Sequence, residues 1–339
     1  MDPFPSLPSL GPSAPRFLGL DVGGTKIAAG VVDADGHIVE QMPSVPCPAA
    51  DQEAMLKAAV LLIQALRSRH PDVAGVGVGV AGLVDWPEGR IRTAPNSAFR
   101  DAPLRRLLRD ATGLPTVVDN DANTACWAEY RLGHSASYMA FVTVGTGVGG
   151  GLVLDDRLFR GSSGVGTEIG HMIVDPHGTE RCGCGTVGCL EPLASGPALA
   201  RYAALAEAGR PTGGPGARTA GRRRVTGEDV TAAAQAGDPA ARAQLARVGH
   251  WLGIGIATLV NLFDVELIVL GGGVAGAGEP LLTPVRESFE EYVTARAHRT
   301  LPDLRLTRCG PEAGWVGAAL LARDGFSAQP REVVRTSVT

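Results

Sequence analysis

The sequence predicts an α/β protein made of two related units, and three observations support this prediction. Apolar runs of strand length alternate with stretches whose apolar residues recur at helical spacing, which is typical of mixed strand and helix architectures. A chain of 339 residues is long enough for two domains with sizeable cores. A strand, a glycine-rich turn and a return strand occur near the start of the chain and again near its middle, which indicates a loose internal duplication.

The first unit is expected to begin near Arg16, where a proline-rich leader ends. Turn residues separate its short apolar runs. Its longest helix is predicted from apolar residues at helical spacing, namely Met55, Ala58, Leu61, Leu62 and Leu66. The elements expected in this unit are strands at 17–21, 27–32, 38–39, 73–80 and 116–118 and helices at 51–68 and 104–109.

The second unit is expected to repeat the strand, turn and strand pattern. A glycine-rich turn at 145–151 follows one apolar run and precedes another. Residues 208–224 are rich in Gly, Pro, Thr and Arg and are typical of an exposed flexible loop. The elements expected here are strands at 140–144, 152–154 and 267–270, a turn at 271–273, and helices at 226–236, 239–262 and 314–322.

Composition excludes several classes of protein. Hydrophobic residues make up 45% of the chain and charged residues 19%, with a net charge of −4, so neither a disordered chain nor a basic nucleic-acid binder is expected. The absence of an 18-residue apolar run predicts no membrane span, and the N-terminus lacks the pattern of a secretory signal. Six cysteines are too few for a disulfide scaffold. A cytoplasmic protein is therefore expected.

Three segments match the G-x-G-x-x-G pattern of dinucleotide sites, beginning at Gly77, Gly145 and Gly271. The second is followed by a strand, whereas a dinucleotide site needs a helix there, and the other two lack an evident βαβ unit with the required acidic residue. These matches do not indicate NAD binding. A G-K-[ST] sequence is also absent, which excludes a Walker-type P-loop.

Two glycine-rich turns are candidate phosphate sites. The first carries a carboxylate, two glycines and two side-chain donors, namely Asp21, Gly23, Gly24, Thr25 and Lys26. The second supplies similar elements without the lysine, namely Gly145, Thr146 and Gly147. Two such turns facing one another would clamp a polyphosphate, with Asp21 near the metal ion that phosphates bring. Two tight hairpins without a ligand are the alternative interpretation.

Four potential metal ligands lie within 19 residues, spaced H-x10-C-x-C-x4-C, namely His171, Cys182, Cys184 and Cys189. Three thiolates and one imidazole are typical of a closed structural zinc site. The interleaved glycines at 183, 185 and 188 allow the tight turns that such ligation requires. The alternatives are buried unligated cysteines or a redox dithiol, although the C-x-C spacing differs from the C-x-x-C of thioredoxin-like proteins.

Asp121 follows an apolar strand, at the kind of sheet edge where α/β proteins bind ligands. It is a candidate general base, with Asn120 and Asn123 as amides that orient it. The alternative is that Asp121 only caps a helix over 122–130. This segment alone leaves both interpretations open.

Two glutamates neighbour the metal ligands. Glu168 precedes His171 by three residues, and Glu191 follows Cys189 by two. A histidine that binds zinc through one ring nitrogen can offer the other to a neighbouring group. Zinc would thereby fix His171 and both glutamates around one polar pocket.

Together these residues resemble the ROK family (repressors, open reading frames and kinases), and within it the glucokinases. The resemblance spans most of residues 17–321. It is carried by the segments LGLDVGGTKIAAGVVD, VAGLVD, APNSAFRDAPL, VVDNDANTACWAEYRLG, VTVGTGVGGGLVL, GTEIGHM, CGCGTVGCLEPLASGPAL and IVLGGGVAGAG. The chain departs from the family pattern at Ser97 and Phe99, beside Asn96, and at Thr167, where Gly or Ala is usual.

The resemblance implies an actin-like ATPase (ribonuclease H-like) fold with two α/β domains around a central cleft. A disordered leader at 1–15 would precede a small domain at 16–119, to which a C-terminal helix at about 313–325 returns. A large domain at 120–312 would carry the zinc site.

The resemblance also implies roles for individual residues. Asp121 would take the proton from the sugar 6-hydroxyl. The other sugar hydroxyls would be held by Asn96, Asn120, Glu168, His171 and Glu191. Phosphate and Mg2+ would face Asp21, Gly23, Gly24, Thr25, Gly145, Thr146 and Gly147. Adenosine would contact Gly271, Gly272 and Gly273. The family's zinc ligands match His171, Cys182, Cys184 and Cys189.

The activity expected from these residues is an ATP-dependent hexokinase, with glucose as the acceptor and glucose 6-phosphate as the product. A kinase for N-acetylmannosamine, fructose or N-acetylglucosamine and a non-catalytic sugar-sensing regulator are the alternatives. About 16 residues before the first strand are too few for the helix-turn-helix domain of the family's repressors, so no nucleic-acid partner is expected. The family implies a homodimer or homotetramer.

Overall fold

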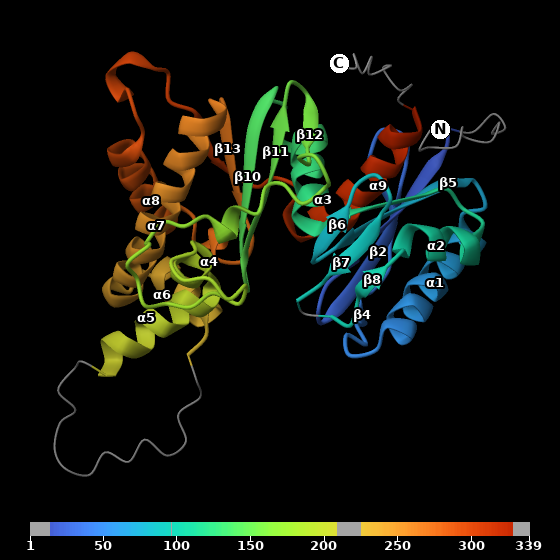
Figure 1. Ribbon diagram of the computed structural model, residues 1–339, viewed down its shortest axis with the longest axis horizontal. Helices are drawn as coiled ribbons and strands as arrows, with labels where there is room; N and C mark the ends of the chain where they lie inside the picture. Colours follow the sequence, from blue (N-terminus) through green and yellow to red (C-terminus); the bar gives the residue numbers. More distant parts are fainter. Residues whose placement is uncertain (1–13, 96, 209–224, 328–339) are drawn as a thin grey trace, which may run out of the picture. The chain divides into compact units, whose positions relative to one another are not determined.

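The computed structural model describes residues 14–95, 97–208 and 225–327 (Figure 1). It divides into two compact units. Unit 1 comprises the described parts of Met1–Ala128, Arg160–Val165 and Glu312–Thr339, and unit 2 comprises those of Glu129–Phe159 and Gly166–Pro311. Apart from residues 14, 15 and 208, the expected leader and the expected loop over 208–224 lie outside the described residues.

Unit 1 is built on a mixed sheet with the strand order β3-β2-β1-β5-β9, and β4 pairs with β2. β1 runs antiparallel to β2 and parallel to β5, which in turn runs parallel to β9. Every residue of β5 is buried, as expected for a central parallel strand covered on both faces. The strands are β1 (Arg16–Val22), β2 (Lys26–Val32), β3 (Ile38–Gln41), β4 (Val45–Pro46), β5 (Val73–Val80) and β9 (Thr116–Asn120).

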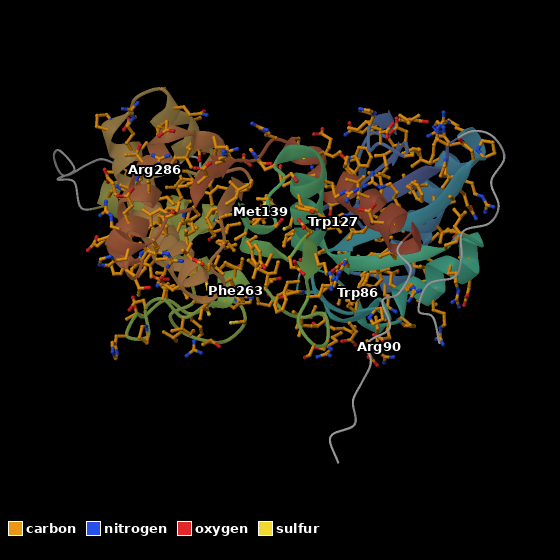
Figure 2. All side chains as sticks on the ribbon, turned by 90° about the horizontal axis from the view of Figure 1, so that it is seen from above. Trp86, Arg90, Trp127, Met139, Phe263 and Arg286 are labelled. Atoms are coloured by element: carbon orange, nitrogen blue, oxygen red, sulfur yellow. The ribbon has the colours of Figure 1, made fainter. Side chains whose placement is uncertain are left out.

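A small second sheet and four helices complete unit 1. The sheet has the order β6-β7-β8. The elements are β6 (Leu83–Asp85), β7 (Arg90–Thr93), β8 (Arg100–Ala102), α1 (Gln52–Arg69), α2 (Leu104–Thr112), α3 (Asp121–Ala128) and α9 (Ala313–Ser327). α9 packs closely on β1 and β5 (Figure 1). At Gly19 of β1 this leaves no room for a side chain, because a Cβ there would lie 1.8 Å from the Trp315 carbonyl oxygen. Trp127 of α3, which is labelled in Figure 2, donates through Nε1 to Asp324 of α9 at 2.9 Å.

The expected first helix is present as α1, but one residue of its predicted apolar face is not in the core. Asp51 caps α1 by accepting the N–H groups of Glu53 and Ala54 at 2.9 and 3.2 Å. The side chains that α1 buries are Met55, Ala59, Leu62, Ile63 and Leu66. Leu61 is 55% exposed, because it lies just outside the stripe that faces the sheet.

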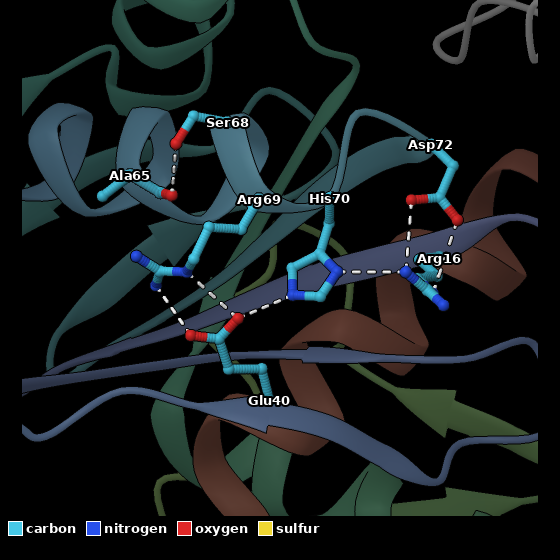
Figure 3. A network of polar contacts seen from close by, with 7 residues as sticks. All are labelled: Arg16, Glu40, Ala65, Ser68, Arg69, His70 and Asp72. Atoms are coloured by element: carbon cyan, nitrogen blue, oxygen red, sulfur yellow. Dashed lines mark hydrogen bonds and ion pairs between the residues drawn. The ribbon is translucent and has the colours of Figure 1, made fainter.

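A polar network joins the end of α1 to β3 and to the start of β1 (Figure 3). His70 lies between Glu40, at 2.7 Å from Nε2, and Arg16, at 3.0 Å from Nδ1. Arg69 also pairs with Glu40, and Arg16 pairs with Asp72. An Arg can only donate, so the His70 ring bonded in this way holds its proton on Nε2.

Unit 2 is built on a sheet with the order β12-β11-β10-β13-β14. The strands are β10 (Tyr138–Val144), β11 (Val148–Leu154), β12 (Arg157–Phe159), β13 (Leu267–Gly271) and β14 (Asp303–Leu306). The expected turn at 145–151 is wrong in extent, because residues 148–151 belong to β11. Gly150 allows tight packing of the sheet against Ile169, since a Cβ there would lie 2.3 Å from Cδ1 of Ile169.

The helices described in unit 2 are η1 (Glu129–Gly133), η2 (Ile169–His171), α4 (Glu191–Ala194), α5 (Gly196–Ala208), α6 (Gly227–Gln235), α7 (Pro239–Phe263), η3 (Ala275–Ala277), α8 (Glu279–Tyr292), η4 (Arg296–His298) and η5 (Gly310–Glu312). α5, α6, α7 and α8 contribute buried residues to a separate hydrophobic core that includes the inner residues of β10 and β13. α7 is long and apolar enough to cross a membrane by length and composition, but the core helices of soluble proteins meet the same criterion. Leu245, Val248, Leu252 and Val260 of α7 are buried in this core.

Candidate active site

Asp21 lies near the carboxyl end of β1, where it is largely shielded from water. Burial, together with the nearby charge of Asp121, raises its pKa to about 7, while Lys26 acts in the opposite direction. Gly314 of α9 faces this carboxylate, because a Cβ there would lie 2.6 Å from Oδ2 of Asp21. A glycine at 314 therefore leaves the space that the carboxylate occupies.

The turn that follows Asp21 is tight and presents polar groups. The Gly23 N–H donates to the Lys26 carbonyl at 3.0 Å, and the Cys47 N–H donates to the Thr25 carbonyl at 2.9 Å. Thr25 and Lys26 are exposed. The turn is thus held by its own backbone, and its hydroxyl and ammonium groups face solvent, where they can bind an anion.

The side chain of Asn120 caps the N-terminus of α3. The Asn120 Oδ1 accepts the N–H groups of Ala122 and Asn123 at 2.9 and 3.2 Å. Asp121 accepts the Ala122 N–H through Oδ1 at 2.9 Å. Because the Asn120 side chain supplies the cap, helix capping does not account for the carboxylate of Asp121.

Asp121 and Asp21 come from opposite sides of β5 in the sheet order, and they interact electrostatically. Burial raises the pKa of Asp121, while the N–H of Ala122 lowers it. A carboxylate with a raised pKa is a better proton acceptor near neutral pH. The arrangement therefore suits one carboxylate for base chemistry and its neighbour for a cation.

In unit 2, the four predicted metal ligands converge. Their ligand atoms all lie within 4.8 Å of one another. Nδ1 of His171 lies 3.4 Å from Sγ of Cys182, and Sγ of Cys184 lies 3.7 Å from Sγ of Cys189. Gly185 and Gly188 adopt φ values of 92° and 85°, so these two glycines allow the turns that gather the cysteines.

The thiols of this cluster differ in acidity. A hydrogen bond from the Thr186 N–H lowers the pKa of Cys184 to about 7. Burial, followed by the neighbouring thiols, raises the pKa of Cys189 to about 12. Three thiolates so close together repel one another, so their joint ionisation requires a cation.

Both predicted glutamates lie beside this cluster. Nε2 of His171 lies 3.9 Å from Oε2 of Glu168, while Nδ1 faces the thiols. Oε1 of Glu191 accepts from Sγ of Cys182 at 3.7 Å, and Oε2 accepts from the Val148 N–H at 3.1 Å. The cluster, both carboxylates and the second glycine-rich turn thus form one connected region of unit 2.

The glycines at 145–147 and 271–273 also lie together in unit 2. The Val274 N–H donates to the Val144 carbonyl at 3.1 Å, and the Gly196 N–H donates to the Gly145 carbonyl at 2.8 Å. Gly272 has φ of 85°, and a Cβ there would lie 2.4 Å from the Val144 carbonyl oxygen. Two turns more than 120 residues apart in the sequence therefore meet at one end of the sheet.

Two other results concern the predicted residues. Asn96 lies outside the described residues. Sequence reasoning missed Gly314, and also Asp119 and Arg160, which pair at 2.6 Å. Asp119 stands beside Asn120 in the sequence, which is a weak signal. Arg160 and Gly314 carry no recognisable pattern, because their partners are distant in the chain.

Comparison with known proteins extends these observations. Residues 17–325 match the model of the ROK family. The chain is 38% identical to a glucokinase of Streptomyces coelicolor over 91% of this chain and 97% of that protein. It is 35% identical to an N-acetylmannosamine kinase of Escherichia coli O139:H28 over 90% of this chain and 98% of that protein.

The fold is similar to that of a ROK family glucokinase from Streptomyces griseus, solved in complex with glucose and AMPPNP. The TM-score is 0.79 and the identity 38%, over 91% of this chain and 99% of that structure. The expected α/β fold of the actin-like ATPase type is therefore confirmed. Because the family model matches nearly all of the described residues, the chain belongs to the ROK family.

Proposed function

We propose that this protein is an ATP-dependent sugar kinase that converts glucose to glucose 6-phosphate. The observation that carries the proposal is the pair of half-buried carboxylates in unit 1, Asp121 and Asp21, whose pKa values burial raises, beside a glycine-rich turn. The similarity to glucokinases over nearly the whole chain supports the same activity.

Asp121 is the general base in this proposal. It accepts the proton of the sugar 6-hydroxyl as that oxygen attacks the γ-phosphorus of ATP. Burial raises the pKa of Asp121, and a base is most effective when its pKa lies near the working pH. Because phosphoryl transfer passes through a loose transition state, the protein acts chiefly by positioning the reactants and neutralising charge.

Asp21 serves the nucleotide side of the reaction. A carboxylate is a preferred Mg2+ ligand, and Mg2+ bound with ATP neutralises charge on the phosphates. The donors of the turn at 23–26 and the backbone groups of Gly145, Thr146 and Gly147 are proposed to bind phosphate. Gly271, Gly272 and Gly273 are proposed to contact adenosine, and the sugar hydroxyls are assigned to Asn96, Asn120, Glu168, His171 and Glu191.

The residues of the thiol cluster fit a structural zinc ion. Zinc bonded tetrahedrally to two thiolates at about 2.3 Å sets them about 3.8 Å apart, and Cys184 and Cys189 lie 3.7 Å apart. Three cysteines and one histidine fill all four positions of such a site, so its contribution is to hold structure. His171 and Glu191 would be positioned by it, since both contact Cys182.

The protein is further proposed to work in the cytoplasm as a homodimer or homotetramer. None of its six cysteines, all within the described residues, forms a disulfide bond, which suits a reducing compartment. Light scattering coupled to size-exclusion chromatography measures the mass of the assembly. A monomer at micromolar concentration would contradict the proposed assembly.

The proposed activity is tested with purified protein, ATP, Mg2+ and a panel of hexoses, measuring both ADP and sugar phosphate. The expected result is the highest kcat/KM for glucose among glucose, N-acetylmannosamine, fructose and N-acetylglucosamine. A higher value for N-acetylmannosamine would transfer the proposal to that substrate. Hexose binding without ADP formation would show a sugar sensor instead of a kinase.

A further inference from the structure

Arg160 and Asp119 form a buried ion pair in unit 1. Nε of Arg160 donates to Oδ2 of Asp119 at 2.6 Å, and the two side chains are only 13% and 2% exposed. A buried carboxylate is costly unless it is paired and hydrogen-bonded. Arg160 therefore compensates the buried charge of Asp119 at this position.

The other oxygen of Asp119 holds the segment that carries Asp121. Oδ1 of Asp119 accepts the Asn120 N–H at 2.8 Å and Nδ2 of Asn123 at 2.9 Å. These two donors flank Asp121 in the sequence, and Asn123 is 1% exposed. One carboxylate thus fixes the residue before Asp121 and the residue two positions after it.

Arg160 is itself held in place by an aromatic ring. Its guanidinium carbon lies 3.6 Å from the ring centroid of Trp86, which is labelled in Figure 2. The Trp86 N–H donates to the Ser163 carbonyl at 3.1 Å, so the segment 160–165 is anchored on the strand end that carries Trp86. A planar guanidinium can stack on a ring and bind a carboxylate at the same time, which an ammonium group cannot do.

From these contacts we propose that Arg160 is a positioning residue for phosphoryl transfer, acting through Asp119 to orient the general base Asp121. This inference rests on the proposed function for the role of Asp121. Loss of the Arg160 charge would leave the Asp119 carboxylate buried without a cation, and its side chain would then turn away. That movement would release Asn120 and Asn123.

The test compares Arg160→Met with the double variant Asp119→Asn/Arg160→Met. In the single variant we expect kcat to fall about 10²-fold, the scale of a small misplacement of a reacting group. The uncompensated Asp119 charge also raises the pKa of Asp121, so the acid limb of the kcat–pH profile moves to higher pH. KM for ATP changes little, because the phosphate-binding turn is not touched.

The double variant should recover both properties. A neutral Asn at 119 still offers a carbonyl oxygen to Asn120 and Asn123, and it needs no cation. We expect kcat within about threefold of the wild type and the acid limb restored, since the coupled pair is then removed as a unit. If Arg160 had only a structural role, the acid limb of the kcat–pH profile would neither shift in Arg160→Met nor return in the double variant.

Two further variants keep the test decisive. Arg160→Lys keeps the charge and is expected to fold, but it loses the stacked planar contact, so an intermediate fall in kcat is expected. Arg69→Met removes an arginine that pairs with Glu40 in the network of Figure 3, and it should leave kcat unchanged. Thermal unfolding of every variant verifies that each is folded.

Hydrogen exchange of the peptide covering 119–124 tests the contacts independently of activity. Exchange should accelerate in Arg160→Met and return to the wild-type rate in the double variant. This result does not depend on the proposed function, because it is expected even if the wild type phosphorylates no hexose. Wild-type exchange, kcat and pH profile in Arg160→Met would overturn the inference. A double variant as impaired as Arg160→Met would also overturn it.

Discussion

Glu191 and Val148 are joined by a hydrogen bond from the Val148 N–H to Oε2 of Glu191, at 3.1 Å. Oε1 of the same carboxylate accepts from Sγ of Cys182 at 3.7 Å. A single side chain therefore connects a proposed metal ligand with the first residue after the turn at 145–147. The position of that turn and the order of the thiol cluster are coupled through Glu191.

Gly147→Ala should disturb this connection. A Cβ at position 147 would lie 2.4 Å from Oε2 of Glu191, so the carboxylate must move away from Val148. We expect hexose affinity to fall about tenfold, which corresponds to about 1.4 kcal/mol, as measured by calorimetric titration. At Gly145 a Cβ would meet no heavy atom of the described residues within 4 Å, so Gly145→Ala is the matched control for hexose affinity. Equal hexose affinities in the two variants would contradict the coupling.

Asp121→Asn should remove catalysis while leaving the fold intact. General-base assistance contributes about 10²–10⁴-fold to a rate, and we expect kcat to fall by that factor. The melting temperature should not decrease, because the change removes a carboxylate whose pKa is raised by burial. Asp110→Asn, at an exposed carboxylate near the end of α2, is the control. Near-normal turnover of Asp121→Asn would show that another group takes the proton.

Asp21 should make the stability of the nucleotide-free protein depend on pH. Its folded pKa of about 7 lies above the ordinary value of 3.8, so folding favours the protonated form. That contribution is complete below about pH 4 and is lost as the pH rises through about 7, with a slope of at most about 1.4 kcal/mol per pH unit.

Asp21→Asn removes this dependence, so its advantage in free energy of unfolding over the wild type should grow from pH 5 to pH 8. Urea unfolding in metal-free buffer at each pH measures the difference. The same variant should bind Mg2+–ATP more weakly, because it loses a carboxylate ligand. A pH-independent difference in stability would show that Asp21 is ionised throughout.

Removal of the thiol cluster's metal should affect both stability and sugar binding. Elemental analysis is expected to find one zinc ion per chain in the wild type and none in Cys184→Ser. Without the metal His171 and Glu191 lose their common anchor, so hexose affinity and melting temperature should both fall. Cys47→Ser changes a cysteine of unit 1, outside the thiol cluster, and should leave the zinc content and hexose affinity unchanged. Unchanged hexose affinity in a zinc-free protein would separate the cluster from the sugar site.

Thr167 holds an unfavourable backbone conformation immediately before Glu168. Its φ is 67°, a left-handed value that is rare for a β-branched residue and costs about 1–3 kcal/mol. Thr167→Gly relieves this cost, and we expect a higher free energy of unfolding in urea. Thr226→Gly is the contrasting variant, since Thr226 caps α6 with an extended backbone. A loss of stability in Thr167→Gly would mean that the threonine side chain makes contacts worth more than the strain.

Local features of this protein could be predicted from its sequence. β5 has the predicted bounds, Val73–Val80, because a continuous apolar run is typical of a strand buried on both faces. The ligands His171, Cys182, Cys184 and Cys189 were also recognisable, because all four lie within 19 residues with glycines between them. Such signals depend on spacing along the chain, which the sequence states directly.

The tertiary structure decided which distant residues meet. Asp21 and Asp121 are 100 positions apart, and they interact because β1, β5 and β9 lie side by side in parallel. Asp119 meets Arg160 because the segment Arg160–Val165 belongs to unit 1, and Asp21 meets the space left by Gly314 because α9 returns to the sheet. The periodicity of apolar residues in the sequence shows which face of a helix or strand is apolar. The order of strands in the sheet determines which other elements that face contacts. Which side chain caps α3 was decided by where the Asn120 side chain points.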